Sequence, residues 1–220
     1  MNIGMTQVVS VNTSLPRISE VVSRCLDIAV ALLALIFIVP LLATIAVAIK
    51  LADGGPVLFS HRRIGRDGQP FGCLKFRSMV VDAEERLARL LAVDELARQE
   101  WLKDHKLRDD PRVTPLGSFL RRSSLDELPQ LFNVLRGEMS IVGPRPIVQA
   151  EVARYGRRFA SYCAVRPGIT GLWQVSGRND VSYRRRVACD VVYARRKSLG
   201  RDVFIIVWTV PAVLKGQGSY

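Results

Sequence analysis

Histidine, aromatic residues and paired cysteines are scarce in this chain of 220 residues. The only two histidines, His61 and His105, lie far apart, so a histidine-based triad or zinc site is not expected. The four cysteines, at positions 25, 73, 163 and 189, lack metal-ligand spacing. Scattered thiols of this kind are typical of a reducing cytoplasm.

The glycine loops that cradle nucleotide phosphates are also missing. The sequence contains neither a GxGxxG motif nor a Walker loop, which excludes phosphate binding of those two kinds. A hydrophobic fraction of 49% excludes a disordered chain. The length allows one large domain or two small ones, each able to bury a core.

Positive charge, in contrast, is in excess. The formal net charge is +12, which indicates an anionic partner: nucleic acid, acidic lipid headgroups or a polyphosphate substrate. So basic a chain reaches 49% hydrophobic residues only if its apolar residues are concentrated in a few places.

Most of the apolar excess lies in one run, IAVALLALIFIVPLLATIAVAI, at residues 28–49. A helix of about 22 residues is roughly 33 Å long, and a bilayer core is about 30 Å thick. We therefore predict a membrane segment at residues 23–51, after a flexible tail at residues 1–22. Pro40 favours a kink, which leaves two alternatives, a simple span or a re-entrant hairpin. More basic residues follow the run than precede it, which places residues 52–220 in the cytoplasm.

A second apolar stretch, at residues 203–214, is too short to span a bilayer. It is either an interfacial segment or a core helix of the main domain. Between the two stretches, alternation at residues 71–79 predicts a strand after a turn at Asp67-Gly68. Cys73, Lys75 and Arg77 would share one face of this strand, with Leu74 and Phe76 on the other. An amphipathic helix is predicted at residues 81–107, with a capping box formed by Asp82 and Glu85.

The densest polar chemistry lies between residues 109 and 145. Asp126 and Glu127 directly precede the helical run LPQLFNVLRG. Proline is tolerated only in the first turn of a helix, so Pro129 predicts a helix that begins at about residue 126 or 127 and ends at Gly137. Ser124 and Glu127 have capping-box spacing, so a cap without catalytic function is one interpretation.

The surrounding arginines indicate another function. Arg121 and Arg122 lie just upstream of the carboxylates, and Arg145 lies between two prolines that fix its backbone. Arginines bind phosphate bidentately, and paired carboxylates bind a divalent metal. We infer a phosphoryl-transfer site, in which an ionised Asp126 attacks a diphosphate substrate and Mg²⁺ neutralises the phosphate charge.

Three segments resemble the bacterial sugar transferases, the monotopic polyprenyl-phosphate phosphoglycosyl transferases. They are KFRSM at 75–79, DPRVTPLGSFLRRSSLDELPQLFNVLRGEMSIVGPRP at 110–146 and RPGITGLWQVSGR at 166–178. The resemblance covers residue 23 to the C-terminus. It implies transfer of hexose 1-phosphate from a UDP-sugar to undecaprenyl phosphate, with release of UMP and a covalent aspartyl-phosphosugar intermediate. The segment TGLWQVSGRNDVSYRRRV and the GQGSY ending are similar to the short exopolysaccharide-priming members, which use UDP-glucose or UDP-galactose.

The resemblance also assigns roles to residues. Asp126 matches the family's nucleophile, and Glu127 matches the second member of the dyad that supports Mg²⁺. Asp190, in CDVVY, matches an aspartate of an LDxYY-like segment, although Cys189 and Val192 depart from that pattern; it is the third candidate metal ligand. The candidate substrate contacts, which lie in the KFR, DPRV, FLRR and PRP segments, are Lys75, Arg77, Arg112, Arg121 and Arg145.

In this family the N-terminal apolar helix breaks at a proline and returns to the cytoplasmic side, which favours the hairpin here. The expected fold is α+β and mainly helical. It has a re-entrant membrane helix, interfacial helices and a small β element on a cytoplasmic catalytic domain, at the inner membrane of a bacterium.

The arginine clusters at residues 157–158, 184–186 and 195–197 support an alternative, a membrane-tethered protein that binds acidic lipid or nucleic acid without catalysis. No recognised nucleic-acid module is present, so the transferase is preferred and nucleic acid is not an expected partner. The sequence leaves open the sugar, the polysaccharide and the oligomeric state, including a homo-oligomer.

Overall fold

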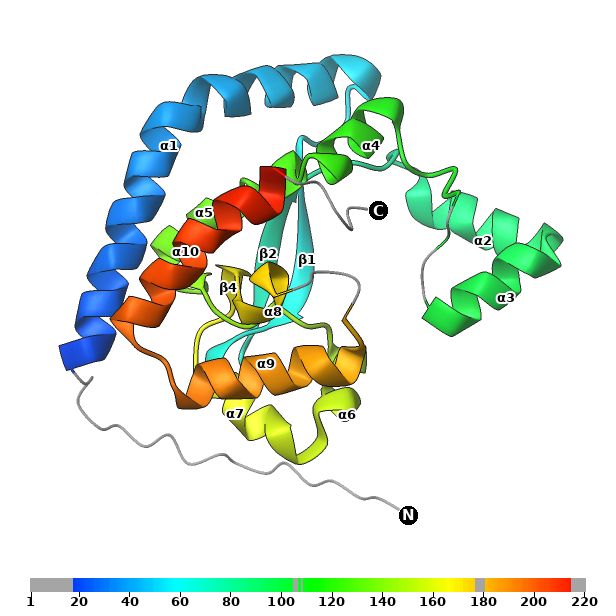
Figure 1. The fold of residues 1–220 in the computed structure, drawn as a ribbon. Helices are drawn as coiled ribbons and strands as arrows, with labels where there is room; N and C mark the ends of the chain where they lie inside the picture. Colours follow the sequence, from blue (N-terminus) through cyan, green and yellow to red (C-terminus); the bar gives the residue numbers. More distant parts are fainter. Residues whose placement is uncertain (1–17, 105–106, 108, 177–180, 215–220) are drawn as a thin grey trace.

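The computed structural model describes residues 18–104, 107, 109–176 and 181–214, in which helices surround two small sheets (Figure 1). The helices are α1 (Ile18–Asp53), α2 (Ala83–Val93), α3 (Glu95–Asp104), α4 (Pro115–Arg122), α5 (Gln130–Arg136), α6 (Val152–Tyr155), α7 (Phe159–Cys163), α8 (Leu172–Val175), α9 (Tyr183–Arg195) and α10 (Leu199–Leu214). The strands are β1 (Leu58–Ile64), β2 (Pro70–Phe76), β3 (Ser140–Val142) and β4 (Gly168–Thr170). Short 3-10 turns are η1 (Arg66–Gly68), η2 (Leu125–Glu127), η3 (Gln149–Glu151) and η4 (Gly156–Arg158).

The predicted α+β, mainly helical class is confirmed. Several sequence features lie outside the described residues: the tail at residues 1–17, His105, the last two residues of the 166–178 segment, and the GQGSY ending.

The apolar run forms a single bent helix, α1, with Pro40 inside it (Figure 1). The helix begins at Ile18, so residues 18–22 are helical and do not belong to the predicted tail. Proline has no N–H to donate to the preceding turn, which accounts for a bend. In the described part of the chain, this is the one helix long and apolar enough to cross a bilayer. Only 17% of its most apolar window is buried, whereas a soluble core helix would be mostly buried.

Two polar side chains fix the first turns of α1 onto the rest of the protein. Arg24 donates to the carbonyls of Val134 and Leu135, at 2.7 and 3.0 Å, near the end of α5. The buried carboxylate of Asp27 accepts from Ser140 Oγ and the Ile141 N–H, both at 2.8 Å. Carbonyls at a helix C-terminus and charges in a core both need partners, so these bonds satisfy groups that burial would otherwise penalise.

The hairpin of β1 and β2 carries part of the candidate site. The turn predicted at Asp67-Gly68 is confirmed, with φ of 57° and 73° at the two residues. In the antiparallel register, His61 faces Cys73 and Phe59 faces Lys75. Directly opposed residues share a face, so β1 contributes its own side chains beside Lys75.

The predicted two faces of β2 are also visible in its surroundings. Cys73 and Lys75 line a common pocket, whereas Phe76 is buried against Leu120 and Ile45. Arg77 lies beyond the end of the strand, so it does not extend the face of Lys75.

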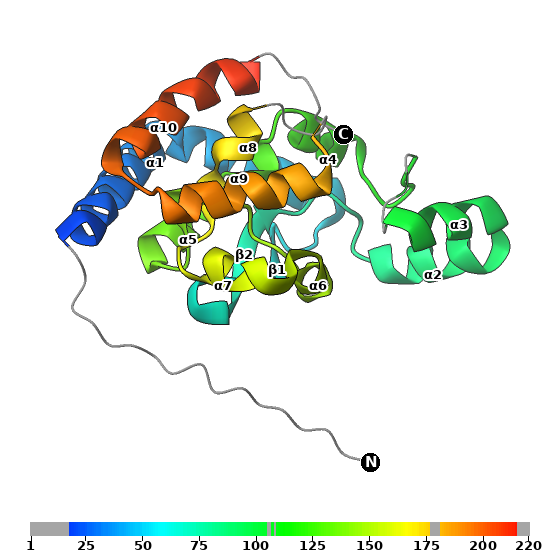
Figure 2. The same cartoon turned by 60° about the horizontal axis from the view of Figure 1, so that its bottom comes forward.

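The predicted helix at 81–107 is wrong in one respect, because it is two helices, α2 and α3. Asp94 has an extended backbone, and its Oδ1 accepts from the N–H of Ala97 at 3.0 Å, so it caps the start of α3. The predicted capping box is absent: Asp82 makes no cap bond and accepts instead from Arg86 Nε at 2.9 Å. The two helices pair and extend away from the body (Figures 1 and 2).

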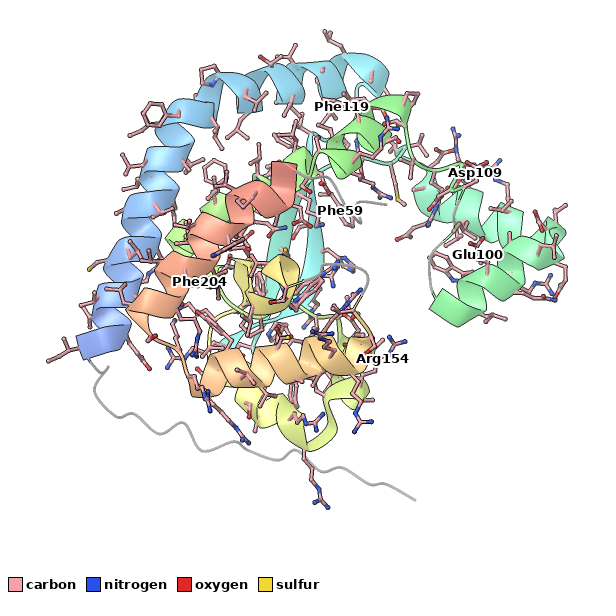
Figure 3. The ribbon with its side chains drawn as sticks, viewed as in Figure 1. Phe59, Glu100, Asp109, Phe119, Arg154 and Phe204 are labelled. Carbon is pink, nitrogen blue, oxygen red and sulfur yellow. The ribbon has the colours of Figure 1, made fainter. Side chains whose placement is uncertain are left out.

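The second apolar stretch belongs to α10 and combines the two predicted alternatives. Ile205 is fully buried in the main hydrophobic core. Phe204 and Trp208 are each 52% exposed, and Phe204 is labelled in Figure 3. One face of α10 therefore packs on the domain, and the other is a free apolar face.

Candidate active site

The carboxylate pair lies in a tight turn, η2, between α4 and α5. Ser124 has a left-handed backbone, with φ of 58°, and its side chain makes no cap bond. The predicted Ser124–Glu127 capping box is therefore wrong, and α5 begins at Gln130, not at residue 126 or 127. Gly137 ends the helix as predicted, with φ of 85°. The turn places Asp126 and Glu127 ahead of the helix and not inside its first turn.

Lys75 on β2 contacts both carboxylates. Its Nζ lies 2.6 Å from Glu127 Oε1 and 3.7 Å from Asp126 Oδ2. The side chain of Asp126 is only 10% exposed, whereas that of Glu127 is 34% exposed. The shared ammonium offsets part of the repulsion between the two adjacent carboxylates.

Asn133 sets the distance between Lys75 and the dyad. This fully buried residue of α5 accepts from the Leu74 N–H at 2.9 Å and donates to the Gly72 carbonyl at 2.7 Å. Its amide therefore joins α5 to β2 on both sides of Cys73. Nothing in the sequence pattern distinguishes Asn133 from an ordinary polar residue of a helix.

A small, basic, open-sided pocket lies beside the dyad, with Glu127 in its lining. Arg63 and Arg145 lie in its wall, close enough that the Arg145 guanidinium disfavours the charge on Arg63. Burial, followed by this repulsion, lowers the pKa of Arg63. The residues that line the pocket are Arg63, Cys73, Lys75, Glu127, Gln130, Arg145, Pro146, Gly168, Ile169 and Gln174.

Neighbouring groups hold the two arginines in place. Arg63 donates to the Pro146 carbonyl at 3.2 Å and to His61 Nδ1 at 3.1 Å. Burial and the nearby cations lower the pKa of His61, so its ring nitrogen is free to accept that bond. The Tyr162 hydroxyl donates to the Ile64 carbonyl at 2.7 Å and accepts from the Ile147 N–H at 3.3 Å. The Tyr162 hydroxyl thus connects the backbone next to Arg63 with the backbone two residues after Arg145.

The two carboxyl groups of the dyad are pushed in opposite directions. Burial raises the pKa of Asp126 above its ordinary value, although Lys75 opposes the shift. For Glu127, burial acts upward, but Lys75, Arg145 and Arg63 outweigh it and lower the pKa. The neighbouring cations thus hold Glu127, more firmly than Asp126, in its ionised form.

The remaining predicted arginines lie outside the pocket lining. Arg121 donates to Ser78 Oγ at 2.8 Å, and its charge favours ionised Asp126. Arg77 pairs with Asp53 at the end of α1. Arg112 forms a two-point pair with Asp110, and its guanidinium lies 5.1 Å from the ring centre of Trp101. Arg77 and Arg112 are thus engaged in structural pairs, and only Arg121 acts on the dyad.

Asp190 is not brought to the dyad. It is buried on α9 and accepts from the Tyr155 hydroxyl at 2.7 Å. Within the described ranges, no three acidic, histidine or cysteine side chains are grouped as a metal site. Two carboxylates alone still fit Mg²⁺, which usually takes one or two protein carboxylates and completes its shell with phosphate and water. Asp126 and Glu127 are such a pair.

A comparison with known families decides the class of the protein. The model of the family described as bacterial sugar transferase matches residues 18–216, nearly the whole chain. The chain belongs to the bacterial sugar transferase family. The long apolar helix agrees with the membrane association of this family.

Three relatives of this sugar transferase are close to half identical to it. Exopolysaccharide production protein ExoY of Sinorhizobium fredii is 49% identical over 92% of the chain and 90% of the relative. UDP-galactose-lipid carrier transferase of Erwinia amylovora is 49% identical over 92% of the chain. Undecaprenyl-phosphate galactose phosphotransferase of Salmonella typhimurium is 48% identical over 95% of the chain. The chain spans only 42% and 44% of the lengths of the last two.

Sequence reasoning missed four polar or reactive groups of this sugar transferase pocket. Arg63 was interpreted only as a basic flank of the membrane segment, although its place on β1 follows once β1 pairs with β2. Gln130, Gln174 and Cys73 line the pocket without any sequence signal of function. Alternation along LFSHRRI would have shown that His61 and Arg63 share a face.

Asp190 makes the stability of the fold dependent on pH. Burial raises its pKa to about 7, so the folded state holds this proton more tightly than the unfolded chain. The contribution of protonated Asp190 to the stability of the fold is complete at low pH and is lost as the pH rises through about 7. We expect Asp190→Asn to remove the part of the fall in melting temperature that Asp190 causes between about pH 4 and 7, and to gain on wild type over that range. Thermal unfolding in detergent would measure this. The exposed variant Glu84→Gln is the control, and parallel profiles for Asp190→Asn and wild type would contradict the assignment.

Proposed function

We propose that this protein transfers hexose 1-phosphate from UDP-glucose or UDP-galactose to undecaprenyl phosphate and releases UMP. The reaction would start the assembly of an exopolysaccharide repeat unit. The observation that carries the proposal is the Asp126–Glu127 pair, bridged by Lys75, beside a pocket that Glu127 and Lys75 line together with Arg63 and Arg145. The printed names of the relatives, which include lipid-carrier and undecaprenyl-phosphate transferases, support it.

In the first step, Asp126 acts as the nucleophile. An oxygen of its carboxylate forms a bond to the phosphorus that carries the sugar, and the bond from that phosphorus to the bridging oxygen breaks. UMP leaves with the bridging oxygen and its electron pair. In the second step, an oxygen of undecaprenyl phosphate attacks the same phosphorus and the aspartyl oxygen leaves, so Asp126 is regenerated.

The surrounding cations bind and stabilise charge. Arg63 and Arg145 lie where they can hold the diphosphate, because guanidinium forks match phosphate oxygens. Lys75 favours the ionised form of both carboxylates and holds Glu127 the more firmly. Mg²⁺, when bound by Asp126 and Glu127, would neutralise phosphate charge and stabilise the leaving group. Preorganised charge of this kind is usually the largest contribution to catalysis.

The neutral polar residues of the pocket lining suit a sugar. Gln174 donates to the Ile169 carbonyl at 3.1 Å, which fixes the orientation of its amide. Its Oε1 is buried and has no hydrogen-bond partner among the described residues. A hydroxyl group of the hexose can supply the missing donor, because a buried acceptor without a partner is costly. Gln130 lines the same pocket and adds a second neutral polar group.

We place the protein at the cytoplasmic face of the inner membrane, with α1 as a re-entrant hairpin. The bend in α1, the low burial of its apolar window and the free face of α10 support this arrangement. The domain would then sit on the membrane surface, where the phosphate of the acceptor lipid lies.

The direct test is UMP release by the purified full chain. We expect continuous release from a UDP-hexose only when both undecaprenyl phosphate and Mg²⁺ are present, and at most one equivalent of UMP per protein when the acceptor is left out. A panel of UDP-sugars would identify the donor. Asp126→Asn should reduce turnover by about a thousandfold or more, because it removes the nucleophile. The variant should stay folded at neutral pH, since burial already disfavours the ionised form of Asp126. Turnover close to wild type in Asp126→Asn would refute the covalent mechanism.

A single turnover distinguishes this function from the alternative. The transferase predicts a phosphosugar attached to the protein when labelled donor is added without acceptor. A catalytically silent binder would instead retain salt-sensitive nucleic-acid or acidic-lipid binding after loss of Asp126 and Glu127, and would release no UMP.

Arg63 and Arg62 offer a matched pair of substitutions. They are adjacent on β1, but Arg63 lines the pocket and Arg62 is exposed on the opposite face. We expect Arg63→Gln to raise the KM for UDP-sugar about tenfold or more, since a buried charge-assisted phosphate contact contributes about 1.5–3 kcal/mol. Arg62→Gln should leave KM unchanged. Steady-state kinetics at fixed acceptor would show this, and equal effects of the two variants would rule out a specific role for Arg63.

The hairpin predicts that both ends of the chain face the cytoplasm. A protease-sensitive tag placed near Asn2 and another at the C-terminus should both be cleaved in inside-out vesicles and protected in intact spheroplasts. Cleavage of the N-terminal tag from the periplasmic side would show a full span.

A further inference from the structure

A second polar pocket lies at the base of α1 and α10, away from the dyad. It shares no lining residue with the catalytic pocket. Its charged lining consists of four cations, Arg24, Arg66, Arg166 and Lys197, and two carboxylates, Glu20 and Asp27. These residues come from four separate places in the chain: α1, η1, the segment before β4 and the connection from α9 to α10.

The carboxylates offset the cations only in part, although Arg66 lies within ion-pair distance of both Glu20 and Asp67. Both oxygens of Asp27 accept from Ser140 Oγ at 2.8 Å, and one also accepts from the Ile141 N–H. Glu20 is half-exposed and lies 3.5 Å from Arg66. Burial, followed by the repulsion of Arg66 and Arg24, lowers the pKa of Arg166. The pocket thus gathers like charges in a half-buried place, and an anion there would relieve their repulsion.

The pocket also lies where two apolar surfaces begin. Arg24 lies one turn before Ile28, the start of the apolar run of α1, and Asp27 directly precedes it. Lys197 precedes α10, which exposes Phe204 and Trp208. The first half of α1 and α10 lie side by side and run from this base in the same general direction (Figures 1 and 2). A ligand bound here would meet a cationic pocket at one end and apolar helix faces beyond it.

We propose that this pocket binds the phosphate headgroup of an acidic membrane phospholipid, with its acyl chains along the exposed faces of α1 and α10. Guanidinium groups suit the phosphate, and the helix faces suit the hydrocarbon. The inference rests on the membrane insertion of α1 given under Proposed function. A lipid held in this way would neutralise the cationic pocket and anchor the first turns of α1 at the membrane surface.

The test compares two double variants. Arg24 and Arg166 donate to backbone carbonyls of the α5 end, so their removal would disturb the fold. Arg66→Gln/Lys197→Gln changes only the other two cations. Arg157→Gln/Arg158→Gln, on exposed η4, removes the same charge elsewhere and is the control. Binding of phosphatidylglycerol and phosphatidylcholine to the full chain in detergent would be measured by native mass spectrometry.

We expect Arg66→Gln/Lys197→Gln to weaken phosphatidylglycerol binding roughly tenfold or more, because each surface cation contributes about 1 kcal/mol to binding an anionic lipid. The control variant should bind like wild type, and phosphatidylcholine should bind weakly to all three proteins. Unchanged phosphatidylglycerol binding, or an equal loss in the control, would overturn the proposal.

Two further measurements separate the sources of phosphate. Inorganic phosphate at millimolar concentration should not displace phosphatidylglycerol, and displacement would show a site for free phosphate. A selective loss of undecaprenyl phosphate binding in the double variant would instead show an acceptor site and refute the phospholipid. Lipid binding is measured without the UDP-sugar donor, so the two results are independent. If the protein releases UMP but the double variant binds phosphatidylglycerol like wild type, this inference alone is refuted. Specific lipid binding without UMP release refutes the transferase alone.

Discussion

The buried amide of Asn133 is the contact on which the geometry of the active site depends. It bonds to the backbone of β2 on both sides of Cys73 and lies on the helix that directly follows the dyad turn. One side chain thereby sets how far Lys75 lies from Asp126 and Glu127. The backbone groups that it satisfies would each cost about 1–3 kcal/mol if left unpaired in the core, so the arrangement is strongly specified. A site that relies on a 2.6 Å ion pair requires such rigidity.

The opposite end of the same helix is tied to the apolar segment. Arg24 caps the last carbonyls of α5, and Asp27 bonds to β3, which pairs with β4. The dyad turn, α5 and the start of α1 therefore form one connected body. The start of α1 thus contacts one end of the helix whose other end follows the dyad turn.

The sequence allowed the local features to be predicted, and tertiary contacts account for the rest. The long apolar helix, the Asp67-Gly68 turn, the end of α5 at Gly137 and the faces of β2 follow from patterns within a few residues. The placement of Arg63 does not, because it needs the pairing of β1 with β2 and the Tyr162 bridge. The dyad turn was misjudged because Ser124 adopts a left-handed backbone, where a capping serine would be extended. Asp126, Glu127, Lys75 and Arg145 were found from their motifs, and the structure brings all four together.

Cys73, in the wall of the pocket, has a consequence for chemical modification. Burial raises the pKa of its thiol to about 11, despite the cations around it. The thiolate is the reactive form, so at neutral pH this sulfur is a poor target for alkylating reagents and peroxides. The thiol stays neutral, and the charged residues in the pocket lining are Arg63, Lys75, Arg145 and Glu127. The reactive centre can therefore work through changes in cellular redox state without a protective partner cysteine.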